Sequence, residues 1–429
     1  MNRTNILSLM FETCQISRSI TDSMWRFDME IDKDYPCPKL WEPVEATLIE
    51  DNKKYCIFIG FPISKQKVVR DGDEYIRLSG VSYGWYVANR PLRPAERTLQ
   101  STQSGNNIII EDPIIYLNRL FFTDGNRLGL KKGYWDASTN GWGTNELPYH
   151  QFESNENTTV QSVLDEICAY TGLIYLDYWM QVGPAWEPVS FLINSVNLDT
   201  KIGLPPPLII NSSDDQIDAR THRMIEEIQS TEEGDNWKNR VYVDAKIQDT
   251  DTWYTAVKPA TWDINVDGLE RIYQYCEELP PGADAQAWAT KRCNQIYSLL
   301  CTPTTTFEVP FWYKFDLQLY QKIQFKGFNL VPEDMMRIVE ITYDFSPDGG
   351  AVCSVRCALD REWAAARSLA LILKQDSLAL ADAINKVVNK KTATNSIGTV
   401  TGVSGGSAVV SYKNHNTQSY THARILNNG

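Results

Sequence analysis

The sequence predicts a mainly β protein with α+β elements, and three observations lead to this fold class. Short runs of β-branched and aromatic residues are separated by turn residues over most of the chain. Before residue 360, only two segments show a clear helical period. The chain also contains 13 Trp, 21 Tyr and 14 Phe among its 429 residues, an aromatic content that favours strands and buried interfaces.

The first predicted domain, residues 1–125, is a β domain. Tyr55–Pro62 has the composition of a buried strand, Ser64–Val69 extends it, and Asp71-Gly72 predicts a hairpin turn. A further strand is predicted where apolar residues alternate at Val81, Tyr83, Trp85 and Val87.

Residues 126–236 predict a mixed α/β domain. It opens with a Gly-, Asn- and Trp-rich run over Gly125–Leu147, which we expect to be an exposed loop. A helix capped by Thr158 or Thr159 follows, and Thr171-Gly172 ends it before a strand over Leu173–Tyr178. Its apolar positions are Val160, Val163, Leu164, Ile167 and Cys168. The polar segment Thr231–Asn236 is the expected boundary to the next domain.

Residues 237–360 predict a second β domain that contains one helix, over Asp284–Leu300. Five segments of this domain have strand character: Arg240–Ile247, Phe307–Val309, Phe315–Leu319, Ile338–Phe345 and Val352–Cys357.

Residues 361–391 predict the longest helix of the chain, because the segment from Arg361 to Lys390 contains neither Gly nor Pro. Its apolar face is predicted to dock on a neighbouring domain or on copies of itself, and consists of Ala366, Leu369, Leu373, Leu380, Ala383 and Val387. Residues 392–429 predict a short β tail, too small to fold alone.

The net charge of −13 argues against a groove that binds nucleic-acid phosphates. No segment has the composition of a signal peptide or a membrane span. The nine Cys are scattered and are expected to be free thiols in a reducing cytosol. We therefore expect a soluble protein assembled inside a cell, with no specific nucleic-acid binding.

Four patterns suggest chemistry, and each has a simpler structural interpretation. Gly402–Gly406 matches G-x-S-x-G, but no Asp or Glu follows it, so a hairpin turn is preferred. Asp263–Gly268 matches half of a calcium loop, but Gln274 stands at the twelfth position, where that loop needs a Glu. Cys353 and Cys357 lie on one face of a strand, where a core-facing pair is preferred to a zinc site.

The fourth pattern is the acid pair Glu232-Glu233 near Trp237, which is reminiscent of a glycosidase. Adjacent acids in a polar linker do not face each other across a sugar ring, as glycoside hydrolysis requires. The sequence thus predicts no enzyme, no catalytic residue, no cofactor and no metal.

The order of elements resembles that of bacteriophage baseplate and tail-tip hub proteins. Phe58–Pro62 with Tyr83-Gly84-Trp85 is similar to a hub pattern of strand, charged hairpin and closing aromatic segment. Thr159–Ile167 followed by Thr171-Gly172-Leu173 resembles the short helix of these proteins, and Asn239–Leu359 resembles their second β domain. The tail, Ile397–Leu426, is similar to the first strands of the small, OB-like β-barrels that often close hub and spike proteins.

This resemblance implies two tail-tube-like β-barrel domains in each subunit and a homotrimeric ring that offers six positions to a hexameric tail tube. The expected role is that of a structural virion protein that joins the tail tube protein to spike or distal baseplate proteins around a DNA-passing channel. Whether a spike or lysin domain lies on another chain stays open. Two alternatives also stay open: a carbohydrate-binding adhesion or receptor-binding module, in which Tyr134, Trp135 and Trp142 stack on sugars, and a polysaccharide hydrolase.

Overall fold

The computed structural model describes residues 3–363 with interruptions, and three strands between residues 398 and 426. The interruptions within the first range are 21–23, 51, 71, 94–95, 97–100, 105–106, 111, 124–129, 137–141, 143–158, 184, 213–227, 234–237, 248, 280, 302–303, 313, 330, 349 and 361.

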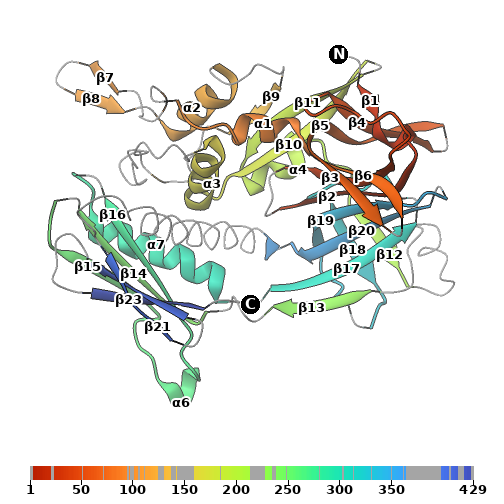
Figure 1. The fold of residues 1–429 in the computed structure, drawn as a ribbon. Helices are drawn as coiled ribbons and strands as arrows, with labels where there is room; N and C mark the ends of the chain where they lie inside the picture. Colours follow the sequence, from red (N-terminus) through yellow and green to blue (C-terminus); the bar gives the residue numbers. More distant parts are fainter. Residues whose placement is uncertain are drawn as a thin grey trace.

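The described residues are mainly β (Figure 1). The strands are β1 (Thr4–Asn5), β2 (Phe11–Ser19), β3 (Arg26–Asp32), β4 (Val44–Glu50), β5 (Lys53–Arg70), β6 (Asp73–Ser82), β7 (Ser101–Ser104), β8 (Asn107–Ile110), β9 (Lys131–Trp135), β10 (Ile174–Val182), β11 (Ala185–Ile193), β12 (Leu208–Asn211), β13 (Gln229–Glu233), β14 (Arg240–Ile247), β15 (Trp253–Lys258), β16 (Ile272–Leu279), β17 (Thr304–Trp312), β18 (Lys322–Lys326), β19 (Met336–Phe345), β20 (Ala351–Leu359), β21 (Gly398–Ser404), β22 (Ser407–Lys413) and β23 (Tyr420–Leu426).

The described helices are short, apart from two. They are α1 (Tyr83–Ala88), α2 (Pro113–Asn118), α3 (Val160–Thr171), α4 (Leu198–Lys201), α6 (Ile264–Asp267) and α7 (Ala285–Leu300), with single turns at η1 (Ile6–Ser8), η3 (Arg119–Thr123) and η4 (Ser195–Asn197). Among the described residues, no helix combines the length and apolarity needed to cross a bilayer.

One large sheet organises the molecule. Its strand order is β1-β4-β5-β6-β3-β2-β19-β20-β17-β13, with β12 and β18 attached beside β19. The decisive contact is the antiparallel pair of β2 and β19, in which Ile16 lies opposite Tyr343. This pair joins strands more than 300 residues apart, so the two predicted β regions share one hydrogen-bonded sheet.

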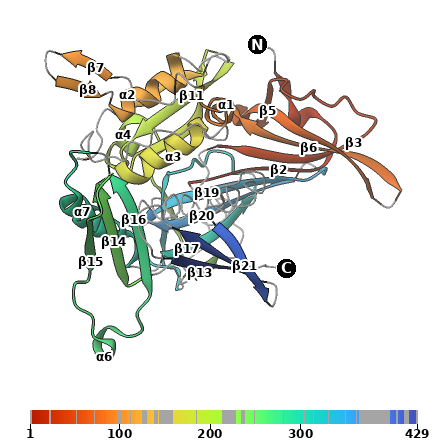
Figure 2. The same ribbon diagram turned by 60° about the vertical axis from the view of Figure 1, so that its left-hand side comes forward.

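Two smaller α/β units pack beside this sheet (Figures 1 and 2). In the first, the sheet β10-β11-β9 lies next to α3. In the second, α7 covers one face of the sheet β15-β14-β16, and its buried Trp288, Cys293 and Ile296 supply much of the contact. A third sheet contains β21, β22 and β23.

Several local predictions are confirmed. The β5–β6 hairpin turns between Arg70 and Asp73, and Gly72 adopts a φ of 94°, which a glycine adopts without strain. Helix α3 begins after Thr159, whose hydroxyl accepts a hydrogen bond from the Ser162 N–H, and it ends at Gly172 in the left-handed conformation. Helix α7 is capped by Asp284. Residues 392–429 contain three strands, so the predicted β tail is confirmed.

Other local predictions are wrong. Tyr83–Ala88 is a helix and not a strand: its buried residues, Tyr83, Gly84, Val87 and Ala88, follow a helical spacing, and the helix packs on α3 and β11. Phe315–Leu319 lies in an irregular segment, although Phe315, Leu317 and Leu319 are all buried. Lys131–Trp135, within the predicted exposed loop, forms β9 beside β11. Glu232 and Glu233, placed in a linker, end strand β13.

Candidate functional site

The most distinctive surface is the uncovered face of the large sheet, which we call the open sheet face. It crosses β6, β3, β2, β19, β20 and β17, and so draws on both predicted β domains. Its residues are Gln15, Ser17, Arg26, Asp28, Glu30, Arg77, Ser79, Glu308, Glu340, Thr342, Asp344, Ser354 and Arg356.

Strict alternation along each strand produces this face, since successive side chains of a strand point to opposite sides. In β3, Phe27, Met29 and Ile31 are buried while Arg26 and Asp28 lie on the other side. In β19, Ile341 and Tyr343 are buried and alternate with the polar Thr342. The opposite face of the sheet therefore packs into the core, and the open sheet face is mostly polar, with Trp312 of β17, 48% exposed, among its apolar side chains.

Ion pairs neutralise two of the arginines of the open sheet face. Arg77 Nε lies 2.8 Å from Asp28 Oδ1, and this hydrogen bond raises the pKa of Arg77. Arg356 contacts two carboxylates, at 3.1 Å from Glu340 and 3.7 Å from Glu308. These pairs cross neighbouring strands, where opposite charges favour pairing.

The balance of charge on the open sheet face is acidic. Its five carboxylates are those of Asp28, Glu30, Glu308, Glu340 and Asp344, and its guanidinium groups are those of Arg26, Arg77 and Arg356, joined by Arg70 of β5, which lies 3.1 Å from Glu30. A surface with this balance lacks the clustered, available cations that hold nucleic-acid phosphates.

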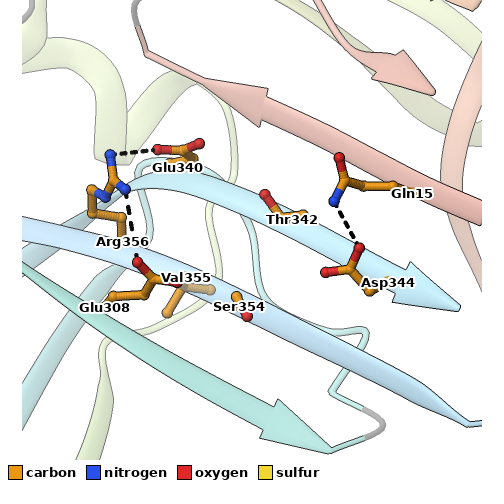
Figure 3. Close-up of a pocket in the computed structure, with 8 residues that line it drawn as sticks. All are labelled: Gln15, Glu308, Glu340, Thr342, Asp344, Ser354, Val355 and Arg356. Atoms are coloured by element: carbon orange, nitrogen blue, oxygen red, sulfur yellow. Dashed lines mark hydrogen bonds and ion pairs between the residues drawn. The ribbon is translucent and has the colours of Figure 1, made fainter. Parts of the chain in front are cut away.

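A depression of about 210 Å³ lies in the open sheet face, between β2 and β17 (Figure 3). Arg356 bridges Glu308 and Glu340 at one end, and Gln15 Nε2 donates a hydrogen bond of 2.8 Å to Asp344 at the other. None of the residues that line the depression is a His, Cys or Lys. Among the described residues, no group of three or more His, Cys, Asp or Glu side chains could hold a metal ion.

The two ends of the sheet are the second notable feature. The outer half of β5, Ser64–Arg70, pairs with β6 on one side, and β4 pairs only with residues 53–60 of β5. At the other end, β13 pairs with β17. No other described strand pairs with the outer side of either segment.

The aromatic residues of the carbohydrate alternative are packed inside the protein. Trp142 is only 5% exposed and contacts Trp288 and Tyr170. Trp135 is partly buried, donates from Nε1 to the Ser190 carbonyl at 3.1 Å and packs on neighbouring phenylalanines. Tyr134 is also partly buried, beside Lys201. Trp142 is therefore not exposed for stacking on a sugar, and Trp135 and Tyr134 are exposed only in part.

The four chemical motifs take the simpler structures. Ser404 lies opposite Ser407 in the β21–β22 hairpin, so the expected turn is confirmed. Asp263 precedes helix α6 and Asp267 is its last residue, and the Asp263 N–H donates to the Asp267 carboxylate at 2.8 Å. Cys353 and Cys357 are both fully buried on β20, and burial raises the pKa of each thiol.

Glu232 and Glu233 are consecutive residues of β13, opposite Thr305 and Thr304 of β17, and therefore belong to a strand and not to a linker. The predicted helix face Ala366, Leu369, Leu373, Leu380, Ala383 and Val387 lies outside the described residues.

Sequence reasoning missed the open sheet face, although part of its signal is visible in the sequence. The alternation in Arg26–Asp32 and Ile338–Phe345 indicates one polar and one apolar side for each strand. Nothing in either segment indicates that the two polar sides become continuous.

No protein-family model matches the chain, and no curated protein matches its sequence. Its fold is instead that of solved tail proteins. The tail protein from Neisseria meningitidis MC58 has a TM-score of 0.54 at 15% identity, over 83% of this chain and 94% of that one. The 43 kDa tail protein of prophage MuSo2 from Shewanella oneidensis has a TM-score of 0.51 at 10% identity, with the same two coverages. The resemblance to phage tail and baseplate proteins is thus confirmed at the level of a mainly β fold.

Proposed function

We propose that this chain is a non-enzymatic structural subunit of a bacteriophage virion, and that it forms the hub ring of a tail tip or baseplate. In this role it assembles in the host cytoplasm as a homotrimer. The ring joins the tail tube protein on one side to spike or distal baseplate proteins on the other, and leaves a channel for DNA ejection.

The open sheet face is the observation that carries this proposal. It is a wide, continuous and mostly polar surface, to which the two predicted β domains contribute adjacent strands. Its arginines Arg77 and Arg356 are engaged by carboxylates, so the surface offers DNA little to bind. A channel wall needs these properties, because a phosphate-binding lumen would retain the DNA that it should let pass.

The first test is the native mass of the purified chain, measured by light scattering after size-exclusion chromatography, followed by electron microscopy of the assembled species. We expect a mass of three copies, in rings with a central opening lined by the open sheet face. A monomer at every concentration from low to high micromolar, also in the presence of the tail tube protein, would contradict the ring.

A further inference from the structure

We infer that the ring closes by strand pairing between copies: β13 of one copy lies antiparallel to the outer half of β5, Ser64–Arg70, of the next. This inference rests on the proposed ring and specifies which surfaces of the chain meet. In the ring, β13 at one end of each sheet therefore pairs with the outer half of β5 at the other end of the neighbouring copy's sheet.

Both segments are exposed and able to add a strand. In the outer half of β5, Ser64, Lys65, Gln66 and Lys67 are exposed, and Val69 is 68% exposed. In β13, residues 229–232 are all exposed. An edge strand with an unoccupied outer side is a template for pairing with another chain, and the five residues of β13 fit within the seven of the β5 segment.

The strand directions fit a ring. From β5 to β13 the sheet order is β5-β6-β3-β2-β19-β20-β17-β13, and every neighbouring pair in it is antiparallel. An even number of alternating strands means that the first and the last run in opposite directions. Rotation about a ring axis along the strands preserves these directions, so β13 meets β5 of the next copy in antiparallel orientation without reversal of any subunit.

The charges of the two strands are also complementary, because the lysines of β5 and the glutamate of β13 lie on the same side of the sheet. Lys65 and Lys67 lie opposite Leu78 and Ile76 of β6, so they share the side of the sheet that faces the core. Glu232 lies opposite Thr305, two positions from the buried Phe307, and therefore shares that same side. We call the β13–β5 strand pair between two copies the joint. When the open sheet faces of the two copies are continuous, both lysines and Glu232 lie on one side of the joint, where opposite charges favour pairing.

The remaining residues fix the other side of the joint. Thr231 lies opposite Thr306, two residues from Glu308 of the open sheet face. Ser64 and Gln66 lie opposite Ser79 and Arg77 of the same face, and Val68 follows at the same two-residue spacing. The inference therefore predicts a parity: Thr231 approaches Ser64, Gln66 or Val68, and not the lysines between them.

Cysteine cross-linking tests this parity directly in the full chain. Thr231→Cys is combined in turn with Ser64→Cys, Gln66→Cys and Val68→Cys, which scans the register in steps of two residues. Matched controls combine Thr231→Cys with Lys65→Cys or Lys67→Cys, and single variants report on the native exposed Cys276. Because a disulfide needs Cα atoms within about 7 Å, only one or two pairs of the first set should form chains of two and three copies under oxidising conditions.

The outcomes separate the joint from the ring. If the wild-type chain forms a trimer but both sets cross-link equally, or neither does, strand pairing at these edges is overturned and the ring stands. If the chain remains monomeric and no pair cross-links, both the ring and the joint are overturned. Selective cross-linking of the first set supports both.

Charge reversal gives a second readout on the native cysteine background. The double variant Lys65→Glu/Lys67→Glu should raise the Kd of self-association at least about tenfold, and addition of Glu232→Lys should recover part of the loss. Reversal of two exposed lysines elsewhere, Lys39→Glu/Lys326→Glu, is the matched control and should leave the Kd unchanged. Equal effects of the two double variants would show a response to net charge only, and would overturn the assignment of these residues to the joint.

Discussion

The backbone N–H of Gly84 donates a hydrogen bond of 3.0 Å to Oδ2 of Asp177. This contact ties the start of α1 to the centre of β10, at a junction where Arg18 also donates to the Asp177 carbonyl. Asp177 is only 2% exposed, and desolvation by burial raises its pKa from 3.8 to about 6. A buried carboxylate therefore links the large sheet to the small sheet β10-β11-β9.

The first prediction concerns the pH dependence of stability at this junction. Because the pKa of Asp177 is higher in the folded chain than in the unfolded chain, its contribution is complete below pH 3.8 and is lost as the pH rises through about 6. The shift corresponds to about 3 kcal/mol of unfolding free energy. Asp177→Asn should remove this dependence, measured as the difference from wild type in chemical denaturation between pH 4 and pH 7.

The control for this experiment is the exposed Asp348, for which Asp348→Asn should leave the pH profile parallel to that of the wild type. The comparison is made as a difference because hydrogen bonds from neighbouring arginines outweigh desolvation by burial and lower the pKa of Glu96 and Asp199 to about 2, which affects stability at the acidic end in both proteins. Identical profiles for Asp177→Asn and the wild type would contradict the prediction.

The second prediction concerns the close packing at Gly84. A Cβ at this position would lie 2.7 Å from Tyr175 Oη and 2.8 Å from Asp177 Cγ, both on a buried strand. Gly84→Ala should lower the free energy of unfolding by roughly 1–3 kcal/mol, measured in urea. Gly350→Ala is the comparison, because its nearest obstacle is the movable Ser346 hydroxyl. Equal stability of the two variants would contradict the steric argument.

The third prediction concerns Arg337, a nearly buried cation at the start of β19. Its Nη1 lies 2.7 Å from Asp199 and its Nε 2.6 Å from Asp360, so one guanidinium joins α4 to the end of β20. Arg337→Met should cost about 1.5–3 kcal/mol, because it removes charged hydrogen bonds to two partly exposed carboxylates that water can solvate in its absence. Arg337→Lys should retain only part of that stability, since an ammonium lacks the planar fork. Thermal unfolding of both variants checks this order.

The fourth prediction concerns the acidic balance of the open sheet face. Asp28→Lys, Glu308→Lys and Asp344→Lys together should create a surface that binds double-stranded DNA, with an affinity that falls as salt increases. The wild-type assembly should not bind under the same conditions. The control variant carries lysines at three exposed acids outside this face, Asp34, Glu42 and Asp263. DNA binding of equal strength by both triple variants would mean that DNA affinity depends on the net charge of the chain and not on the charges of the open sheet face.

The fifth prediction concerns the apolar face of the segment 361–391. Leu373→Asp with Leu380→Asp should weaken docking or self-association at least about tenfold, because a charge in an apolar seam is desolvated without a partner. Analytical ultracentrifugation measures the effect. Lys374→Asp, one position along the same segment, is the control. An unchanged association constant for the leucine variants would remove this face from the assembly.

Sequence patterns alone determined the elements whose signals are local. The cap at Thr159, the stop at Gly172 and the turn at Gly72 depend on hydrogen bonds and φ angles within a few residues, so α3 and the β5–β6 hairpin were predictable. The helix after Asp284 and the alternation in Arg240–Ile247 were predictable for the same reason.

Tertiary structure alone decided how these elements combine. The pairing of β2 with β19 closes a loop of more than 300 residues, and no local pattern encodes that register. Tyr83–Ala88 became a helix because its apolar side chains found partners on α3 and β11, which overrode their strand-like alternation. The open sheet face exists only because this long-range pairing places the polar sides of separate strands next to one another.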